Sequence, residues 1–243
     1  MLLIISCQKE DDLLQQQIVE GSSVLSIVNY DFAPLGGPCV VAFTTNSSWK
    51  LINYPEWLMP DKTSGSSGTT IIKILSKANE TGNLREATLE FVVDGGRSSF
   101  ITVNQEAPYL NISNDTLSFA WNDCRIVRDS LVIDKDPQII GISSNVAWRI
   151  SEDMTSISSH DVEYFFLSEM AGRNDCDLMV IPMQYNIGKD PIDVRLRLYP
   201  VIEDEDGTVT EFSSAVIDSY VIKLHQSNFN LLVDSTDFEI LTR

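Results

Sequence analysis

The chain has 243 residues, of which 43% are hydrophobic and 21% charged, a composition typical of a globular protein rather than a disordered one. It contains no run of 18 apolar residues, which argues against a helix that crosses a bilayer. The 17 basic and 35 acidic residues give a net charge of −18, which should repel nucleic-acid phosphates and anionic membrane surfaces. We therefore expect two small globular domains and no nucleic-acid partner.

The first seven residues differ from everything that follows them. An apolar run, Leu2–Ile5, ends in Ser6 and Cys7, and this ending resembles the lipobox that a bacterial lipoprotein signal peptidase recognises. The basic and longer apolar parts of a signal peptide are missing, as they would be if the true start lay further upstream or the segment had been trimmed. The resemblance implies that residues 1–6 are a signal remnant and that Cys7 is lipidated.

The acidic segment after the cysteine supports the same interpretation. Gln8–Asp12 is similar to the export tag of surface lipoproteins of Bacteroidetes. We therefore expect an acidic linker over residues 7–22 and a lipid anchor in the outer membrane, with the protein exposed at the cell surface. A buried N-terminal strand is the alternative.

Two copies of one pattern then follow each other. Asn46-Ser47-Ser48-Trp49 recurs 99 residues later as Asn145-Val146-Ala147-Trp148, each time between an apolar run and a short strand. Each copy closes on a strand that ends in glutamine, Phe100–Gln105 in the first and Tyr220–Gln226 in the second. These copies predict two domains, residues 23–107 and 108–228.

Strands in both copies alternate between apolar and polar positions. Ala87–Phe91 and Val194–Leu198 each place apolar side chains on one face and polar side chains on the other. This pattern is typical of antiparallel sheets with one buried and one wet face. The sequence predicts an all-β protein of two tandem immunoglobulin-like β-sandwich domains. Trp49 and Trp148 stand where such a sandwich keeps its core tryptophan, so we expect both to be buried.

The first copy resembles a known family, the BACON domain, over nearly all of residues 24–107. The matching features occur in order: Gly36-Gly37, Asn46, Trp49, Trp57-Leu58, Gly65, Asn79, Arg85, and Ile101, Val103 and Gln105. The resemblance implies a small β-sandwich found in surface proteins of gut Bacteroidetes. It also implies a non-catalytic module that binds carbohydrate or mucin-type glycans, or serves in some glycosidases only as a spacer.

The second copy is a divergent relative of the first. It lacks the Gly-Gly pair, and Phe166-Leu167 is expected to replace Trp57-Leu58. The features that it keeps are Asn145, Trp148, Gly172, Asn186 and Gln226.

The sequence shows little that points to catalysis, a metal or a cofactor. Beyond Cys7, three cysteines remain without CxxC spacing, so no zinc or redox motif is encoded: Cys39, Cys124 and Cys176. A disulfide between Cys124 and Cys176 and three buried thiols both fit the sequence. His160 and His225 are interpreted as solvated surface side chains. The acidic segment Glu203–Gly207 is interpreted as a charged hairpin tip rather than a calcium loop.

Exposed aromatic side chains are the candidates for binding sugar, because the apolar face of a pyranose stacks on an aromatic ring. Asn53-Tyr54-Pro55-Glu56-Trp57 combines two aromatics with an amide and a carboxylate in a loop-like stretch that the second copy lacks. We therefore predict a carbohydrate-binding site at Tyr54, Trp57, Asn53 and Glu56. A packing role competes at Tyr54, Trp57 and Trp121, because aromatics on short strands usually pack.

The chain continues beyond the second copy. Leu231–Ile240 parallels Leu110–Phe119, so residues 229–243 are predicted to form a C-terminal strand, as at the start of a third repeat. Three hypotheses for the function remain. The protein is a non-catalytic surface lipoprotein that binds polysaccharide or mucin-type glycan, a structural spacer or protein-interaction stalk, or a small hydrolase with a carboxylate pair.

Overall fold

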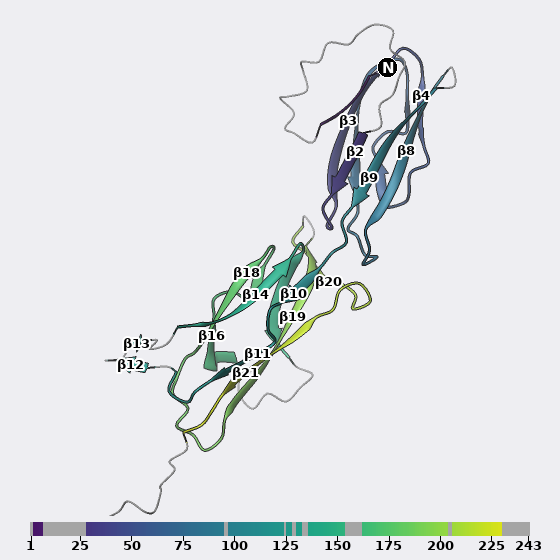
Figure 1. The fold of residues 1–243 in the computed structure, drawn as a ribbon. Helices are drawn as coiled ribbons and strands as arrows, with labels where there is room; N and C mark the ends of the chain where they lie inside the picture. The colour runs from purple at the N-terminus through teal and green to yellow at the C-terminus, as the bar shows by residue number, and fades with distance from the viewer. Residues whose placement is uncertain are drawn as a thin grey trace, which may run out of the picture. The chain divides into compact units, whose positions relative to one another are not determined.

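The computed structural model of the chain describes residues 2–6, 28–94, 97–123, 125–127, 130–132, 136–153, 162–203 and 206–229. In this part of the chain almost all regular structure is β-strand, arranged in two compact units (Figure 1). Each unit contains two large sheets whose apolar faces are buried. The predicted fold class, two immunoglobulin-like β-sandwiches, is confirmed.

The first sandwich consists of nine strands. They are β1 (Leu2–Ser6), β2 (Val28–Phe32), β3 (Gly37–Thr45), β4 (Trp49–Ile52), β5 (Leu58–Pro60), β6 (Ser64–Gly65), β7 (Gly68–Ser76), β8 (Arg85–Val93) and β9 (Arg97–Gln105). One sheet has the order β1-β3-β7-β5 and the other the order β2-β9-β8-β4-β6. The β2–β9 pair is parallel and the other pairs are antiparallel.

The second sandwich repeats this topology. Its strands are β10 (Leu110–Ile112), β11 (Thr116–Phe119), β12 (Arg125–Val127), β13 (Ser130–Val132), β14 (Gln138–Ser144), β15 (Ala147–Glu152), β16 (Phe165–Leu167), β17 (Ala171–Gly172), β18 (Cys176–Pro182), β19 (Ile192–Glu203), β20 (Val209–Glu211) and β21 (Tyr220–Gln226), with a 3-10 turn, η2 (Val162–Tyr164). The sheets are β10-β14-β18-β16 and β11-β21-β19-β15-β17. Again the first strand of the second sheet, β11, runs parallel to the last, β21.

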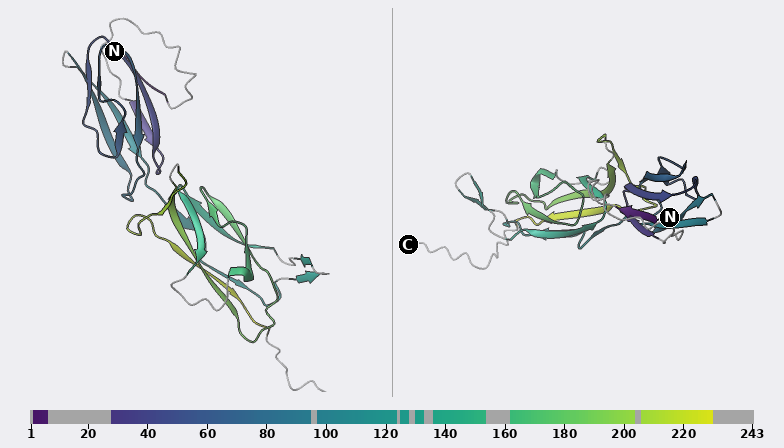
Figure 2. Two further views of the ribbon diagram at one scale, coloured as in Figure 1. Left: turned by 180° about the vertical axis from the view of Figure 1, so that it is seen from behind. Right: turned by 90° about the horizontal axis from the view of Figure 1, so that it is seen from above.

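Two hairpins extend the second sandwich. The β12–β13 hairpin forms a separate two-stranded sheet and stands away from the large sheets in the views of Figure 2. β19 and β20 pair antiparallel, as expected for a hairpin, and residues 204 and 205 of the predicted charged tip lie outside the described residues. Hydrogen bonds from the backbone and side chain of Thr208 lower the pKa of Asp206 there.

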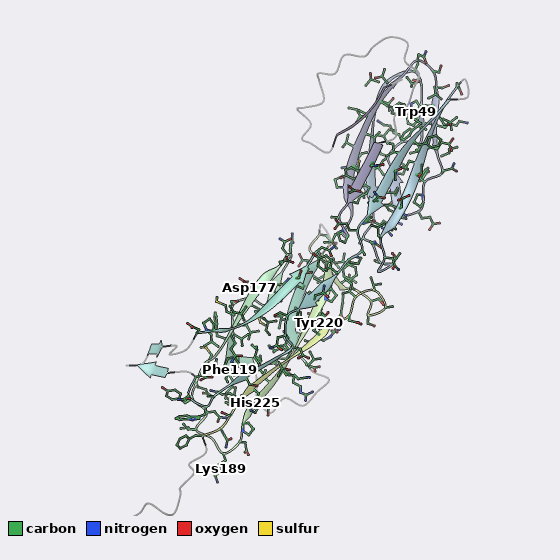
Figure 3. All side chains as sticks on the ribbon, in the orientation of Figure 1. Trp49, Phe119, Asp177, Lys189, Tyr220 and His225 are labelled. Atoms are coloured by element: carbon green, nitrogen blue, oxygen red, sulfur yellow. The ribbon has the colours of Figure 1, made fainter. Side chains whose placement is uncertain are left out.

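A tryptophan lies at the centre of each core, as predicted. Trp49 is 2% exposed and Trp148 is 1% exposed. The Trp49 ring, labelled in Figure 3, lies 4.7 Å from that of Phe43 in an edge-to-face arrangement. Trp148 Nε1 donates a hydrogen bond to the carbonyl of Asn174 at 3.1 Å.

Each of these tryptophans faces a glycine on a two-residue edge strand. Gly65 is the register partner of Trp49, and Gly172 is that of Trp148. A Cβ on Gly65 would lie 2.5 Å from Trp49 Nε1, and one on Gly172 would meet the Trp148 ring equally closely. These glycines are therefore required because the indole occupies the space of a side chain.

A buried glutamine closes the end of the first sandwich. Gln105 Nε2 donates to the carbonyls of Ala33, Pro34 and Lys77, each at 3.0 Å. Its Oε1 accepts hydrogen bonds from Arg85 Nε at 2.8 Å and from Ser76 Oγ at 3.1 Å. Buried polar groups need such partners. The Arg85 and Gln105 features of the family resemblance thus hold the scaffold together.

The corresponding glutamine of the second sandwich is less well satisfied. Gln226 Nε2 donates to the carbonyls of Gln184 at 3.0 Å and of Ala120 and Trp121 at 3.4 Å. The register partner of Gln226 is Ile192, whereas that of Gln105 is Arg85. Gln226 Oε1 is buried and has no hydrogen-bond partner in the part of the chain that the structure describes.

The strand register corrects one detail of the second copy. Leu58 pairs with Ser76 in the first sandwich, and Phe165 pairs with Pro182 in the second. Leu58 and Phe165 are both buried, while Phe166 is 45% exposed. Tyr164-Phe165 therefore corresponds to Trp57-Leu58, and the expected match with Phe166-Leu167 is wrong by two residues, because a shift of two leaves the alternation between the two faces of a strand unchanged.

Candidate functional site

The predicted site residues lie in the loop between β4 and β5. Asn53 adopts a left-handed backbone conformation with φ of 59°, which asparagine tolerates better than most residues. The Leu58 amide donates to the Pro55 carbonyl at 3.0 Å and closes a turn. Tyr54 is 39% exposed, so this loop presents its ring to solvent.

Trp57 has a different environment from Tyr54. Its ring packs against the core of the first sandwich, and the guanidinium carbon of Arg85 lies 4.3 Å from the ring centroid. Burial lowers the pKa of Arg85, while the carboxylate of Glu80 acts in the opposite direction. Since the Arg85 guanidinium covers the indole, Trp57 offers little ring surface to a ligand. Glu56 is exposed in the same loop.

Asn53 connects the loop to the outer face of the five-stranded sheet. Its Nδ2 donates to Glu90 Oε2 at 2.8 Å, and Ser98 Oγ donates to Glu90 Oε1 at 2.7 Å. Both carboxylate oxygens of Glu90 are therefore held in place. The structure brings Asn53 together with Glu90, a residue that the sequence-based prediction of the site did not include.

Apolar side chains flank this carboxylate on both sides. Glu90 pairs with Ile52 of β4 and with Phe100 of β9, and residues that pair directly across antiparallel strands project from the same face. Ile52 is 38% exposed and Phe100 is 39% exposed. We call this surface the Glu90 face: Ile52, Asn53, Glu90, Ser98 and Phe100, with the exposed Tyr54 in the adjoining loop.

The Glu90 face combines the groups that sugar recognition requires. An exposed aromatic ring can stack on the apolar face of a pyranose, and a fixed carboxylate can accept hydrogen bonds from its hydroxyls. The alternation of apolar and polar side chains along β8 already predicts that Glu90 lies on the solvent-exposed face of the sheet. Phe100 could have been found in the same way, because it occupies a polar-facing position of β9.

Other chemically distinctive groups lie in the second sandwich. His225 Nδ1 lies 2.7 Å from Asp193 Oδ1 on the exposed face of β19 and β21, in agreement with the predicted surface position. Cys176 carries a free thiol whose pKa is raised, first by burial and then by Glu169 and Asp177. Across the described residues, no group of three or more His, Cys, Asp and Glu side chains is arranged to hold a metal ion.

Several predictions concern residues outside those described. They are the lipidation of Cys7, the acidic linker, the Cys124 partner of the proposed disulfide, His160, and the C-terminal strand beyond residue 229. Leu2–Ser6 forms β1, which pairs antiparallel with β3. No described helix is long and apolar enough to span a membrane.

Comparison with known families gives the class of the first sandwich. Residues 47–106 match the family model of the BACON domain, whose description is a putative binding domain, N-terminal. The resemblance predicted from the sequence is thereby confirmed for this segment, which runs from the loop before Trp49 to the residue after Gln105. A search of curated proteins found no match.

Solved structures show only remote likeness. A Bacteroides ovatus GH5 xyloglucanase in complex with a XXXG heptasaccharide is 17% identical, with a TM-score of 0.33, and the match covers 51% of this chain and 23% of that one. The I9-I11 tandem of titin is 8% identical, with a TM-score of 0.42 and coverage of 84% and 65%. The Yersinia pseudotuberculosis adhesin InvE is 14% identical, with a TM-score of 0.29 and coverage of 80% and 56%. This chain thus spans less than two thirds of each.

Proposed function

We propose that the protein is a non-catalytic, carbohydrate-binding lipoprotein of the cell surface, and that its first sandwich binds glycan on the Glu90 face. The observation that carries this proposal is the fixed carboxylate of Glu90 between two exposed apolar side chains, Ile52 and Phe100. The BACON match of the same sandwich supports a binding role.

The proposed site is shallow, and this determines its strength. One or two stacked rings bury little area, and each hydroxyl of the ligand gives up water for the hydrogen bond that it gains. We expect dissociation constants of about tens of micromolar or weaker. Neutral polysaccharides are the expected ligands, because the net charge of −18 disfavours polyanions.

Replacing Tyr54 or Phe100 by alanine is expected to reduce the retardation of the protein in native gels that contain a bound polysaccharide. Each substitution removes an exposed ring and leaves the core intact. Ile71→Ala is the matched control, since Ile71 is 50% exposed on β7 of the opposite sheet. The site assignment is wrong if both alanine variants are retarded like the wild type. If no polysaccharide retards the wild type, the protein is a spacer.

The anchoring part of the proposal has its own test. We expect the full precursor, expressed with a complete signal peptide, to incorporate labelled palmitate and to remain in the membrane fraction, because Cys7 follows a lipobox-like run. Cys7→Ala should lose both properties, whereas Cys39→Ala should keep them. Continued labelling of the Cys7→Ala protein would contradict lipidation at this residue.

A further inference from the structure

The second sandwich carries a cluster of three aromatic side chains outside its core. Trp121 follows β11, Tyr185 lies between β18 and β19, and Phe229 follows β21. The Trp121 ring lies 4.6 Å from that of Phe229 and 6.1 Å from that of Tyr185. Phe229 is 37% exposed, and the other two are half-buried. Three distant segments thus bring their rings to one end of the sandwich.

The first sandwich shows that the fold does not need these rings. The backbone N–H of Asn79 donates to the Pro34 carbonyl, and the backbone N–H of Asn186 donates to the Trp121 carbonyl. Pro34 and Trp121 therefore occupy equivalent positions in the two sandwiches. The residue before the asparagine is Ala78 in the first sandwich and Tyr185 in the second. The third residue after the repeated glutamine is proline in the first sandwich, Pro108, and phenylalanine in the second, Phe229. The same scaffold end is therefore built with small or rigid residues in one copy and aromatics in the other.

A second difference opens a hollow beside the cluster. In the first sandwich the Arg85 side chain spans the space between Trp57, Gln105 and the carbonyl of Lys77. Ile192 replaces Arg85, and Tyr164 replaces Trp57, in the second sandwich. Both line a hollow of about 520 Å³ together with Tyr185, Asn186, Lys189 and Asp190. Its volume lies within the range of about 300–1,000 Å³ that is usual for small-molecule sites.

The loop that forms one wall of the hollow is held rigidly. Asn186 Nδ2 donates to the Asp190 carbonyl at 3.0 Å, and its Oδ1 accepts from the Gly188 amide at 3.2 Å. Asn228 Nδ2 donates to the Lys189 carbonyl at 2.7 Å. Figure 3 shows Lys189 beyond His225, at the end of the sandwich away from Asp177. The side chains of Lys189 and Asp190 are exposed and thus available to a ligand. A preorganised wall lowers the entropic cost of binding.

We propose that this hollow is a second glycan-binding site, which takes one pyranose unit of a neutral oligosaccharide and does not depend on the Glu90 face. The sugar ring stacks on Tyr185, whose own ring packs beside Trp121, and Trp121 in turn packs against Phe229. Its hydroxyls meet the carboxylate of Asp190 and the ammonium group of Lys189. A neutral sugar is favoured over an anion or a cation because these two opposite charges are adjacent, and over an apolar ligand because Asn186, Lys189 and Asp190 bring polar groups to the wall.

The test uses the soluble full chain and a panel of β-linked gluco-, xylo-, manno- and galacto-oligosaccharides, with saturation-transfer NMR and tryptophan fluorescence as readouts. We expect the wild type to bind at least one of them, and Tyr185→Ala to weaken that binding by about tenfold or more. Phe166→Ala is the control, because Phe166 is 45% exposed on β16 but does not line the hollow. All of these variants are made in a Tyr54→Ala background, so that binding lost with Tyr185→Ala is assigned to the hollow and not to the Glu90 face.

A second variant distinguishes loss of the binding site from loss of folding. Ile192→Arg fills the hollow and offers Gln226 Oε1 the partner that Arg85 gives Gln105. We expect it to bind like Tyr185→Ala while its unfolding midpoint stays at or above that of Tyr185→Ala. The proposal is overturned if wild type, Tyr185→Ala and Ile192→Arg bind equally, or if the wild type binds no member of the panel at millimolar concentration. It is also overturned if Tyr185→Ala and Ile192→Arg abolish self-association of the protein in analytical sedimentation but leave oligosaccharide binding unchanged.

Discussion

Replacing Trp49 by alanine is expected to lower the free energy of unfolding of the first sandwich by about 3–5 kcal/mol. The indole is 2% exposed and contacts Phe43 and Phe91, so its removal leaves a cavity that the sheets cannot close. Trp148→Ala should have the same effect on the second sandwich. Because the two sandwiches can unfold separately, denaturant titration of the full chain should be followed by both fluorescence and circular dichroism.

Trp49→Phe serves as the matched control for the cavity. Trp49 Nε1 has no hydrogen-bond partner among the described residues, so phenylalanine loses volume but no hydrogen bond. In contrast, Trp148→Phe also leaves the Asn174 carbonyl without its donor. We therefore expect Trp49→Phe to be milder than both Trp49→Ala and Trp148→Phe. An unchanged unfolding midpoint in Trp49→Ala would refute the core assignment.

The second large effect is expected from adding a single methyl group. Gly65→Ala should destabilise the first sandwich by about 1–3 kcal/mol, because the new Cβ collides with the buried Trp49 ring and pushes β6 away from β4. Gly172→Ala should act in the same way on Trp148. Ser64→Ala, on the same edge strand but exposed, is the control and should change stability by less than about 0.5 kcal/mol. Equal unfolding midpoints for Gly65→Ala and Ser64→Ala would contradict this, because they would show that β6 moves away from Trp49 without loss of stability.

The fold could be predicted from the sequence because the patterns that indicate it lie within short segments of the chain. Period-two alternation identifies the buried face of strands such as β8 and β19, and the repeated Asn-x-x-Trp pattern identifies both cores. Positions within a strand were harder to assign. In the run Phe165-Phe166-Leu167, a shift of two residues leaves the alternation between faces unchanged, and the pairing of Phe165 with Pro182 shows which residue matches Leu58.

The candidate sites depend on contacts between distant segments, which the sequence does not reveal. Asn53 and Glu90 are 37 residues apart and meet through a hydrogen bond. The aromatics of the second sandwich are spread from Trp121 to Phe229, and their common location follows from the pairing of β11 with β21 and from the backbone hydrogen bonds of Asn186. One signal was present in the sequence, since Tyr185 and Phe229 flank the repeated Asn186 and Gln226 where the first copy has alanine and proline.

Trp57 is a predicted site residue whose surroundings in the structure favour a packing role. Its position beside Tyr54 suggested a pair of stacking rings. The structure instead places the Arg85 guanidinium over the indole, and Arg85 is held by Gln105 and two backbone carbonyls. We infer that Trp57, Arg85 and Gln105 form a structural unit, and we assign the glycan binding that we propose for this sandwich to Tyr54 and the Glu90 face.

The central claim, that this protein binds glycans through exposed aromatic surfaces, is tested most directly by a glycan-array screen of the soluble chain. The wild type should be compared with a double variant, Tyr54→Ala with Tyr185→Ala, in which one exposed or half-exposed ring is removed from each sandwich. The account predicts that the wild type gives signal on a set of neutral glycans and that the double variant loses it while its unfolding midpoint stays close to that of the wild type. Equal signal from the two proteins across the whole array would contradict the claim.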